Sequence, residues 1–462
     1  MRILVGGEDD VAVRLVERLM QEHDVSLIAP EDARGGIVDQ LEVQPFFGSC
    51  TSANLLSEAE VEKTDLFIAC TVVDERNLLA CAEAKQMGAK KAICFLRRLD
   101  VRSNEAEAKK LALAMGIDDV ILPSERLAQE ILRVVLVPDA LDVEIFADGA
   151  VELIKRAIPE HAPITGGPLQ KIGLPKNVIL VQAKRNGKRF IPKGSTEFQA
   201  GDQITAMGTR KGLGKLSNRF LKAKRLATSA RRATIVGGGV VGYEVARGML
   251  ANGWKIRIIE ADGTRAEQLC DSLPVDCVLH CDGTDLQVLE DNAIADDPVL
   301  IAVTNNDERN LLVSMLAKQM GVPRIITRAD KTDHGRLFES VGIDVVRSTR
   351  GAAIAAVLQH ANVGVRDVQS EFEHGEVKVL QLRVPDSMPE VELRNLNAPV
   401  FAIVGAILAG DKVTIPSGKD ILKGGDQVLV FCSDKDEANT RTFFEDFIAG
   451  SKGGTETQTA HD

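Results

Sequence analysis

The sequence IVGGGVVG at residues 235–242, followed downstream by IIE at residues 258–260, decides the fold of this chain. The pattern is a β-strand, a glycine-rich turn, the start of a helix, and a second strand that ends in an acid. Gly237 permits the tight turn, Gly239 lets the backbone approach a pyrophosphate, and Gly242 lets the helix pack close to the strand. Together these features predict a Rossmann-type domain with a dinucleotide site.

Glu260 supplies the acid that such a site needs. It lies 23 residues after Gly237 (260 − 237), close to the roughly 20 expected of a carboxylate that accepts ribose hydroxyls. The helix N-terminus offers free N–H groups and a partial positive charge to the phosphates. The acid argues against a 2′-phosphate and so against NADP, whereas NAD, NADH, ATP and ADP all stay compatible. The alternative is a Rossmann turn kept only for its shape.

Length and composition are those of a multidomain globular protein. The 462 residues can hold roughly three or four domains, and 45% of them are hydrophobic and 27% charged. The net charge of −11 and the 4% aromatic content argue against a general nucleic-acid binder. No apolar run is long enough for a signal peptide or a membrane span, so we expect an intracellular chain.

The eight cysteines are expected to be reduced. Cys70, Cys81 and Cys94 fall inside apolar strand or helix patterns and are predicted to be core thiols. The segment CVLHC at residues 277–281, with Cys270 nearby, is the one cluster that suggests a metal. It falls on a predicted strand, where residues 277 and 280 would point to opposite faces, so we expect no metal site.

The chain contains the same unit twice. TVVDERNLLACAEAKQMG at residues 71–88 aligns with TNNDERNLLVSMLAKQMG at residues 304–321, an offset of 233. MGIDDV at 115–120 recurs as VGIDVV at 341–346, and the IPKG and GDQ turns at 191–194 and 201–203 recur as IPSG and GDQ at 415–418 and 425–427. The slowly falling offset indicates a duplicated two-part unit with small deletions rather than a short-period solenoid.

Within each unit the first part alternates short apolar strands with amphipathic helices, which predicts a parallel, doubly wound sheet. In the first copy the expected strands are Arg2–Val5, Val25–Ala29, Val43–Phe47, Leu66–Cys70, Ala92–Phe95 and Asp119–Leu122. The expected helices include Val11–Glu22, Glu75–Met87 and Ser124–Val135, the last capped by Ser124. The second part, with short strands at Val143–Phe146, Asn177–Ala183, Phe190–Ile191 and Asp202–Met207, is predicted to be a small α+β domain.

The predicted fold class is therefore α/β, with two Rossmann-like doubly wound parallel-sheet domains, each followed by a small α+β C-terminal regulatory domain. The expected domains are residues 1–136, 137–209, 233–362 and 363–450, with a basic linker at 210–232 and a disordered tail at 451–462. The linker holds nine Lys or Arg and no acid. It is either a solvated helix or a contact for an acidic partner surface or anionic lipid headgroups.

The two glycine turns are expected to differ in function. An offset of 231 places residues 6–11, GGEDDV, over residues 237–242. In that register Glu8 replaces the glycine that faces the pyrophosphate, Val11 replaces the packing glycine, and Ala29 lies where the ribose acid lies in the second copy. Carboxylates beside the phosphates would oppose binding, because two like charges ~4 Å apart near a protein surface repel by about 4 kcal/mol. The first Rossmann domain is therefore predicted to be structural and the second to bind the nucleotide.

Further site residues follow from the rule that ligands of such sheets bind outside the carboxyl ends of the strands. Asp282 follows the third strand, Thr304 and Asn305 the fourth, and Arg328 the fifth, and each is alternatively a helix cap or a turn residue. The predicted cofactor-binding residues are Gly237, Gly238, Gly239, Val240, Val241, Gly242, Glu260, Asp282, Thr304, Asn305 and Arg328. The DERN segments at 74–77 and 307–310 begin matching helices. Because both copies carry them while only one keeps the glycines, we expect a structural or interfacial role rather than ligand binding.

No catalytic residue is predicted. The sole tyrosine, Tyr243, follows the glycine motif, which excludes a Ser-Tyr-Lys dehydrogenase site. His334, His360 and His374 lie in no recognisable acid–base setting, and nucleophile-elbow, Walker and zinc-protease motifs are absent from the sequence. The sequence thus favours a nucleotide sensor over an enzyme.

The arrangement resembles the peripheral NAD-binding subunit of Trk potassium-uptake systems, in which two Rossmann regulator-of-conductance (RCK or KTN) domains are each followed by a small C-terminal domain. The resemblance covers nearly the whole chain and rests on the glycine motif with Glu260, the duplicated Thr-x-x-Asp-Glu-Arg-Asn segments, and the Ile-Pro-x-Gly and Gly-Asp-Gln turns. It implies a homo-oligomeric gating ring, a dimer or tetramer, under a membrane-embedded potassium channel subunit on the cytoplasmic face of the membrane. It also implies that NAD or NADH, or else ATP or ADP, shifts the ring between conformations.

One departure and two rival interpretations stay open. The family often carries an intact first glycine turn and this chain does not, which leaves open how many nucleotides bind per chain. An NAD-dependent oxidoreductase would be supported by cofactor turnover with a reductant. A nucleotide sensor of a different transporter would be identified by a pull-down from membranes with the tagged chain.

Overall fold

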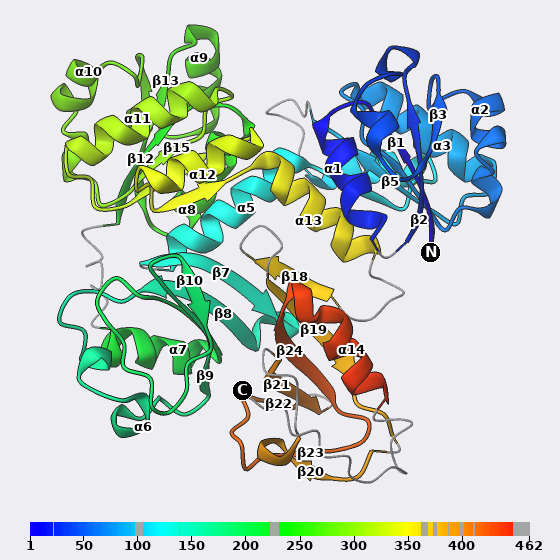
Figure 1. Ribbon diagram of the computed structural model, residues 1–462. Coiled ribbons are helices and arrows are strands. Elements are labelled where there is room, and N and C mark those ends of the chain that lie inside the picture. The colour runs from blue at the N-terminus through cyan, green and yellow to red at the C-terminus, as the bar shows by residue number, and fades with distance from the viewer. Residues whose placement is uncertain are drawn as a thin grey trace. The chain divides into compact units, whose positions relative to one another are not determined.

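The structure is a computed structural model that describes residues 1–21, 23–97, 105–137, 139–221, 231–361, 368–372, 377–386, 388–396, 402–409 and 412–446. The chain divides into two compact units. One contains both α/β halves, Met1–Leu136 and Leu226–Ala361, and the other contains both antiparallel sheets, Val137–Arg225 and Asn362–Asp462 (Figure 1). The tail predicted from residue 451 lies outside the described residues.

The first half is a six-stranded parallel sheet in the order β3-β2-β1-β4-β5-β6. Its strands are β1 (Arg2–Gly6), β2 (Asp24–Ala29), β3 (Gln44–Phe47), β4 (Leu66–Ala69), β5 (Lys91–Phe95) and β6 (Asp119–Ile121). Its helices are α1 (Asp10–Leu19), α2 (Ala53–Glu58), α3 (Asp74–Gln86), α4 (Glu105–Ala114) and α5 (Pro123–Leu136). All six predicted strands are confirmed to within about a residue at each end. The last helix begins at Pro123 rather than being capped by Ser124, because the fixed φ of proline suits the first helical position.

The second half repeats this sheet in the order β14-β13-β12-β15-β16-β17. Its strands are β12 (Arg232–Val236), β13 (Lys255–Glu260), β14 (Val278–His280), β15 (Leu300–Ala302), β16 (Ile325–Arg328) and β17 (Val345–Arg347). Its helices are α8 (Val240–Ala251), α9 (Gly263–Ser272), α10 (Leu286–Asp291), α11 (Asp307–Gln319), α12 (Thr332–Ser340) and α13 (Thr349–Ala361). In both halves the strand order reverses beside the first strand, and that switch point is where such sheets bind ligands.

The two halves exchange their last helices. Ile131 and Val135 of α5, from the first half, lie in the hydrophobic core of the second sheet. Ala353 and Val357 of α13, from the second half, complete the core of the first sheet. Figure 1 shows α5 and α13 side by side within this unit. The buried Arg324 beside β16 also donates a hydrogen bond of 3.0 Å to the Val134 carbonyl of α5, so each half is completed by the other.

The second unit holds two five-stranded antiparallel sheets of the same topology. The first, in the order β10-β9-β11-β8-β7, consists of β7 (Ala140–Phe146), β8 (Val151–Ala157), β9 (Val178–Arg185), β10 (Lys188–Phe190) and β11 (Gln203–Gly208), with α6 (Leu169–Ile172), α7 (Arg210–Lys215) and a π-helix (Leu216–Phe220). The second, in the order β18-β19-β24-β21-β22, consists of β18 (Val368–Phe372), β19 (Val377–Arg383), β21 (Ile403–Ala409), β22 (Lys412–Thr414) and β24 (Gln427–Ser433), with the small pair β20 (Val391–Glu392) and β23 (Ile421–Leu422), and α14 (Glu437–Asp446).

The sequence analysis missed β8, and burial explains why. Leu153 faces a core shared with Val379 and Leu429 of the second sheet. Ile154, on the other face of β8, belongs to the core under the helices of its own domain. A strand covered on both faces lacks the alternation that marks a half-exposed strand.

The linker predicted at residues 210–232 is wrong for its first part. Thr209 caps α7, and Leu213, Leu216 and Leu221 are buried in the core of the first antiparallel sheet. Residues 210–221 therefore belong to the folded domain, and residues 222–230 lie outside the described residues. No helix in the described part of the chain is long and apolar enough to cross a membrane.

Candidate nucleotide-binding site

Two of the glycines after β12 are required by the backbone itself. Gly237 has a φ of 106°, and a Cβ added there would lie 2.8 Å from the backbone nitrogen of Thr304. A Cβ on Gly242 would lie 1.9 Å from the carbonyl oxygen of Gly237. These two positions therefore hold the turn against β15 and the helix against the turn, whether or not a ligand binds.

Gly239 is different, because the fold does not need it to be glycine. It caps α8 with φ −62° and ψ −171°, a conformation open to any residue, and an added Cβ would meet no atom within 4 Å. The open space lies in front of the free N–H groups of the α8 N-terminus, where a phosphate is favoured. This glycine fits a ligand that approaches the backbone closely.

Glu260 ends β13 and turns back to the glycine turn. Its Oε2 accepts a hydrogen bond of 2.7 Å from the Gly238 N–H, and its Oε1 accepts one of 2.9 Å from the Asp262 N–H. The carboxylate is thus oriented beside the turn, as a ribose-binding acid requires. Arg265 of α9 donates from Nε to the Gly238 carbonyl at 2.6 Å. Nothing in the sequence pattern connected α9 to the turn, so this contact was not predicted.

Asp282 lies beyond β14 at the same edge of the sheet. Its Oδ1 accepts hydrogen bonds from the Thr284 N–H (2.9 Å) and hydroxyl (2.8 Å). These bonds, together with the positive charge of Arg309, lower the pKa of Asp282. A Cβ on the intervening Gly283 would lie 2.5 Å from Cγ1 of Val236, so the loop packs directly against the end of β12.

Thr304 takes part in a hydrogen-bond network that the first half repeats. Its N–H and hydroxyl both donate to Asn310 Oδ1, at 2.9 and 2.7 Å, and Asn310 Nδ2 donates to the carbonyls of Thr304 and Arg328 at 3.0 Å. In the first half Thr71 and Asn77 form the same bonds, with distances of 2.7 to 3.0 Å. Because the copy with the acidic turn keeps the network, its role is structural, and both donors of Thr304 are used within the protein.

Asn305 and Arg328 contact each other rather than the glycine turn. Nη1 of Arg328 donates to Asn305 Oδ1 at 2.7 Å, and its Nε donates to Asp330 Oδ2 at 2.8 Å. Of the two valines in the first turn of α8, Val241 is buried in the core and Val240 is half-buried, so both offer chiefly their backbone. The structure thus brings all eleven predicted residues to one edge of the sheet, with Glu260 and the glycines at its centre.

The first turn aligns one residue away from the predicted register. Gly6 pairs with Ile28 and Ala69, as Val236 pairs with Ile259 and Ala302. The offset at the turn is therefore 230 rather than 231, with the pairs Gly7 over Gly237, Glu8 over Gly238, Asp9 over Gly239 and Ala12 over Gly242. The earlier register was wrong because it matched the two adjacent glycines by identity.

This correction identifies the residue that replaces Gly239. Asp9 caps α1, and its Oδ1 accepts hydrogen bonds of 3.1 Å from the N–H groups of Val11 and Ala12. A carboxylate thus occupies the helix N-terminus that a phosphate would use. Ala29 stands at the position of the ribose acid, as predicted, because both residues end the second strand of their sheet.

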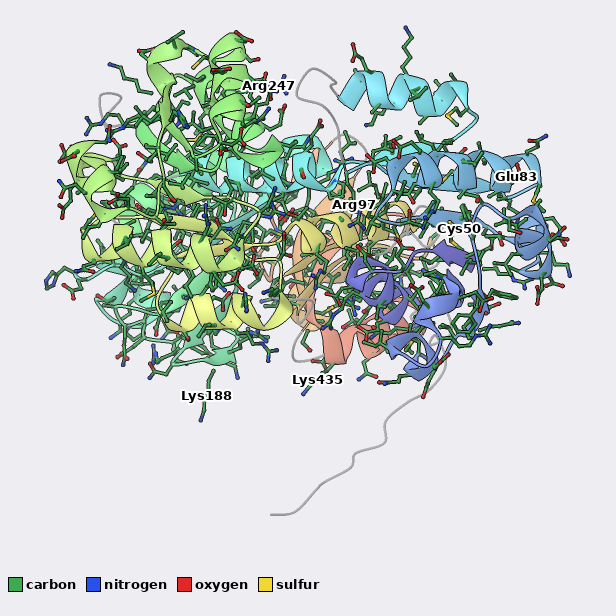
Figure 2. The ribbon with its side chains drawn as sticks, turned by 90° about the horizontal axis from the view of Figure 1, so that it is seen from above. Cys50, Glu83, Arg97, Lys188, Arg247 and Lys435 are labelled. Carbon is green, nitrogen blue, oxygen red and sulfur yellow. The ribbon has the colours of Figure 1, made fainter. Side chains whose placement is uncertain are left out.

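Each acid of the first turn is neutralised by an arginine. Asp9 pairs with Arg97 at 2.7 Å, and Glu8 pairs with Arg76 at 3.1 Å. Asp10 pairs with Arg350 of α13, which comes from the second half. Figure 2 labels Arg97 in the first half.

Arg309 is a candidate ligand residue that the sequence analysis missed. It corresponds to Arg76 at the offset of 233, but the acid that Arg76 meets, Glu8, is replaced by Gly238 in the second half. Arg309 is exposed and forms no ion pair with any residue that the structure describes. Arg309 is therefore a cation with no ion-pair partner among the described residues, at the same edge of the second parallel sheet as Asp282. A phosphate would be a suitable partner for it.

The four cysteines of the first half are buried free thiols. Cys50, Cys70, Cys81 and Cys94 are buried and unbridged. Burial raises the pKa of Cys50, which Figure 2 labels, to about 11. Among the described residues, no three His, Cys, Asp or Glu side chains are grouped so as to hold a metal ion.

Comparisons with known proteins agree on one family. A sequence profile described as the TrkA-N domain matches residues 3–123 and 233–349, and one described as the TrkA-C domain matches residues 153–221. The Trk system potassium uptake protein TrkA homolog of Archaeoglobus fulgidus is 31% identical over 432 residues, covering 93% of this chain and 97% of that protein. TrkA homolog 2 of Methanosarcina mazei is 31% identical over 439 residues, with the same coverage of 93% and 97%. The fold is also that of the GsuK channel bound to NAD, at 17% identity and a TM-score of 0.59 over 97% of this chain and 79% of that chain.

Proposed function

Because this chain belongs to the TrkA family of Trk system potassium uptake proteins, we propose that it is the nucleotide-binding regulatory subunit of a potassium uptake system. In this proposal it has no catalytic role. Nucleotide binding to the second Rossmann domain changes the conformation of the chain and thereby gates a membrane-embedded channel subunit. The chain would lie on the cytoplasmic face of the membrane, attached peripherally.

The observation that carries the proposal is the difference between two turns on one repeated framework. Both halves keep the Thr–Asn network, but only the second has an open helix N-terminus at Gly239 and an oriented acid at Glu260. In the first half Asp9 fills the equivalent position. We therefore propose one nucleotide per chain.

The ligand that the second site favours is NAD or NADH. The proposal is supported by the open space at Gly239, which suits a pyrophosphate, by Glu260, which suits ribose hydroxyls, and by the exposed cation Arg309, which suits phosphates. The GsuK channel, which shares the fold, has been solved bound to NAD. ADP and ATP present the same ribose and phosphate groups and are the alternatives.

Calorimetric titration of the full chain with NADH, NAD, ADP and ATP tests this assignment. Saturable binding of an NAD species at one site per chain, abolished when Glu260 is replaced by alanine, is the expected result. Two equal sites per chain, or binding that survives the Glu260→Ala change, would contradict it. Oxidation of NADH on addition of any carbonyl substrate would instead favour an oxidoreductase.

A homo-oligomer is the second part of the proposal. Exposed leucines occur at equivalent positions of the two halves: Leu79 on α3 and Leu312 on α11 are 54% and 46% exposed. Leu111 on α4 and Leu337 on α12 are 52% and 48% exposed. Solvent-facing leucines that persist in both copies suit contacts with further copies of the chain. Sedimentation of a Leu79→Lys, Leu312→Lys double variant should show a smaller assembly than wild type, and an unchanged mass would remove this support.

Regulation requires that the nucleotide bind the two conformations with different affinity. A typical coupling free energy is ~1–3 kcal/mol, which is enough to change channel opening several-fold or more. Potassium flux into vesicles that contain the membrane subunit should therefore respond to the nucleotide only when the chain is present with an intact Glu260.

A further inference from the structure

The two small C-terminal domains share a topology but differ sharply in charge. Residues 166–221 of the first contain eleven Lys or Arg and two acids, a net charge of +9 (11 − 2). The equivalent residues 390–445, at the offset of 224, contain six Lys or Arg and nine acids, a net charge of −3 (6 − 9). Because the second copy builds the same sheet with acidic residues, the fold does not require the positive charge of the first.

Five of the eleven Lys and Arg residues lie on the helices that cover the first sheet, and one of these five, Arg210, is paired with Glu152. Lys211 and Lys215 of α7 and Arg219 of the π-helix follow one another at four-residue spacing, and all three are exposed. Like charges at this spacing destabilise a helix by about 0.2–0.5 kcal/mol per pair. Lys171 of α6, packed on the same core through Leu169, adds a fourth exposed cation. None of these four cations, which we call the basic surface, forms an ion pair with a described residue.

The corresponding helix of the second domain shows the contrast directly. After the last strand, α14 carries Glu437, Glu445 and Asp446, and Arg441 is paired with Glu437 at 2.6 Å. Protection of an exposed sheet edge by lysine accounts for Lys188 on the edge strand β10, whose side chain extends away from the ribbon in Figure 2. It does not account for cations on helices.

The chemistry of the basic surface favours an extended anionic partner. Between residues 146 and 221 no large apolar side chain is exposed among the described residues. Protein–protein interfaces concentrate apolar and aromatic residues and are depleted in lysine, and non-specific binding to single-stranded nucleic acid uses exposed aromatic rings. Lysines are strongly hydrated point charges that suit a layer of anionic headgroups.

We propose that the basic surface docks the first C-terminal domain on anionic phospholipid headgroups. This inference rests on the proposed position of the chain beside a membrane. Each Lys or Arg near such a surface strengthens binding by about fivefold, so neutralising three should weaken it on the order of 100-fold. Binding should also fall steeply as salt screens the charges.

The test is co-sedimentation of the full chain with vesicles of phosphatidylcholine alone or with phosphatidylglycerol added. We expect binding only to the anionic vesicles, and its loss in the variant Lys211→Gln, Lys215→Gln, Arg219→Gln. The matched control, Lys412→Gln, Lys419→Gln, Lys435→Gln, makes the same change of charge at exposed lysines of the acidic domain and should bind as wild type does.

Absence of binding to anionic vesicles overturns the inference, as does equal loss in both triple variants. If only membranes that contain the Trk membrane subunit retain the chain, and the first triple variant is released from them, the partner is an acidic protein surface and the lipid assignment is wrong. Nucleotide titration of the wild-type chain separates the two proposals. In the wild-type chain, nucleotide binding without vesicle binding refutes this inference alone, whereas vesicle binding without nucleotide binding refutes the proposed function alone.

Discussion

Replacing Gly239 by aspartate should convert the second turn into a copy of the first. The position has backbone angles open to any residue and space for a Cβ, so the fold should accept the change. At a helix N-cap aspartate is favoured over glycine by only a few tenths of a kcal/mol. The new carboxylate should accept hydrogen bonds from the N–H groups of Val241 and Gly242, as Asp9 does in the first half at 3.1 Å.

The magnitude follows from what the nucleotide loses. A phosphate would forfeit charge-assisted hydrogen bonds worth about 1.5–3 kcal/mol each and would face a carboxylate at close range. A loss of at least ~3 kcal/mol corresponds to about 100-fold weaker binding. Calorimetry measures this loss, and thermal unfolding checks that stability is unchanged. Gly335→Asp, at an equally open position in α12, is the matched control and should bind normally. Affinity within threefold of wild type for Gly239→Asp, or the same loss in the control, would refute the reasoning.

Three further predictions concern named contacts. Arg309→Gln should weaken nucleotide binding about tenfold without lowering the melting temperature, and calorimetry that finds unchanged affinity would remove Arg309 from the site. Asn77→Ala and Asn310→Ala should each destabilise the chain by about 3 kcal/mol, because each removes the side chain that bonds the buried polar groups of the Thr–Asn network. Thermal unfolding that shows a loss of less than ~1 kcal/mol for either variant would contradict a structural role. Burial disfavours the charged form of Asp202, but the hydrogen bonds from Arg185 and from the Gln199 N–H, together with the positive charge of Arg185, outweigh burial and lower the pKa of Asp202. Its stabilisation is therefore complete above its ordinary pKa of about 3.9 and is lost as the pH falls through the lowered value, so unfolding curves of wild type and Asp202→Asn should converge below about pH 4 and stay apart at pH 6.

Local patterns were sufficient to predict the parallel sheets and the position of Glu260 beside the glycine turn. Each strand of the first half is a short apolar run between turn residues. Such a run predicts a strand from the local sequence alone, without tertiary information. Glu260 was placed beside the turn because the length of a strand–helix–strand unit fixes where the second strand ends. The strand β8 was missed because its two faces are both buried, so its pattern carries no sign of a sheet surface.

Other features could not be predicted because they depend on contacts distant in the sequence. The register of the first turn follows from strand pairing at Gly6, while identity alone favours an alignment one residue away. The candidacy of Arg309 depends on that register, because its counterpart Arg76 pairs with Glu8 and the register places Gly238 over Glu8. An apolar stripe on α5 shows that the helix is buried, but it does not show which sheet the helix covers.

The exchange of α5 and α13 means that neither half of this chain is a complete folding unit. Severing the chain between the halves would leave one face of each sheet partly uncovered, where α1 or α8 would still pack but the exchanged helix would be missing. A lone half could bury the exposed part by recruiting a second copy of itself. The present chain resembles such a pair with its two members joined end to end. Leu132 of α5 also packs against Gly248 of the helix that begins at the nucleotide turn. A ligand that displaces α8 must therefore move a helix of the opposite half, and that helix leads within four residues into β7.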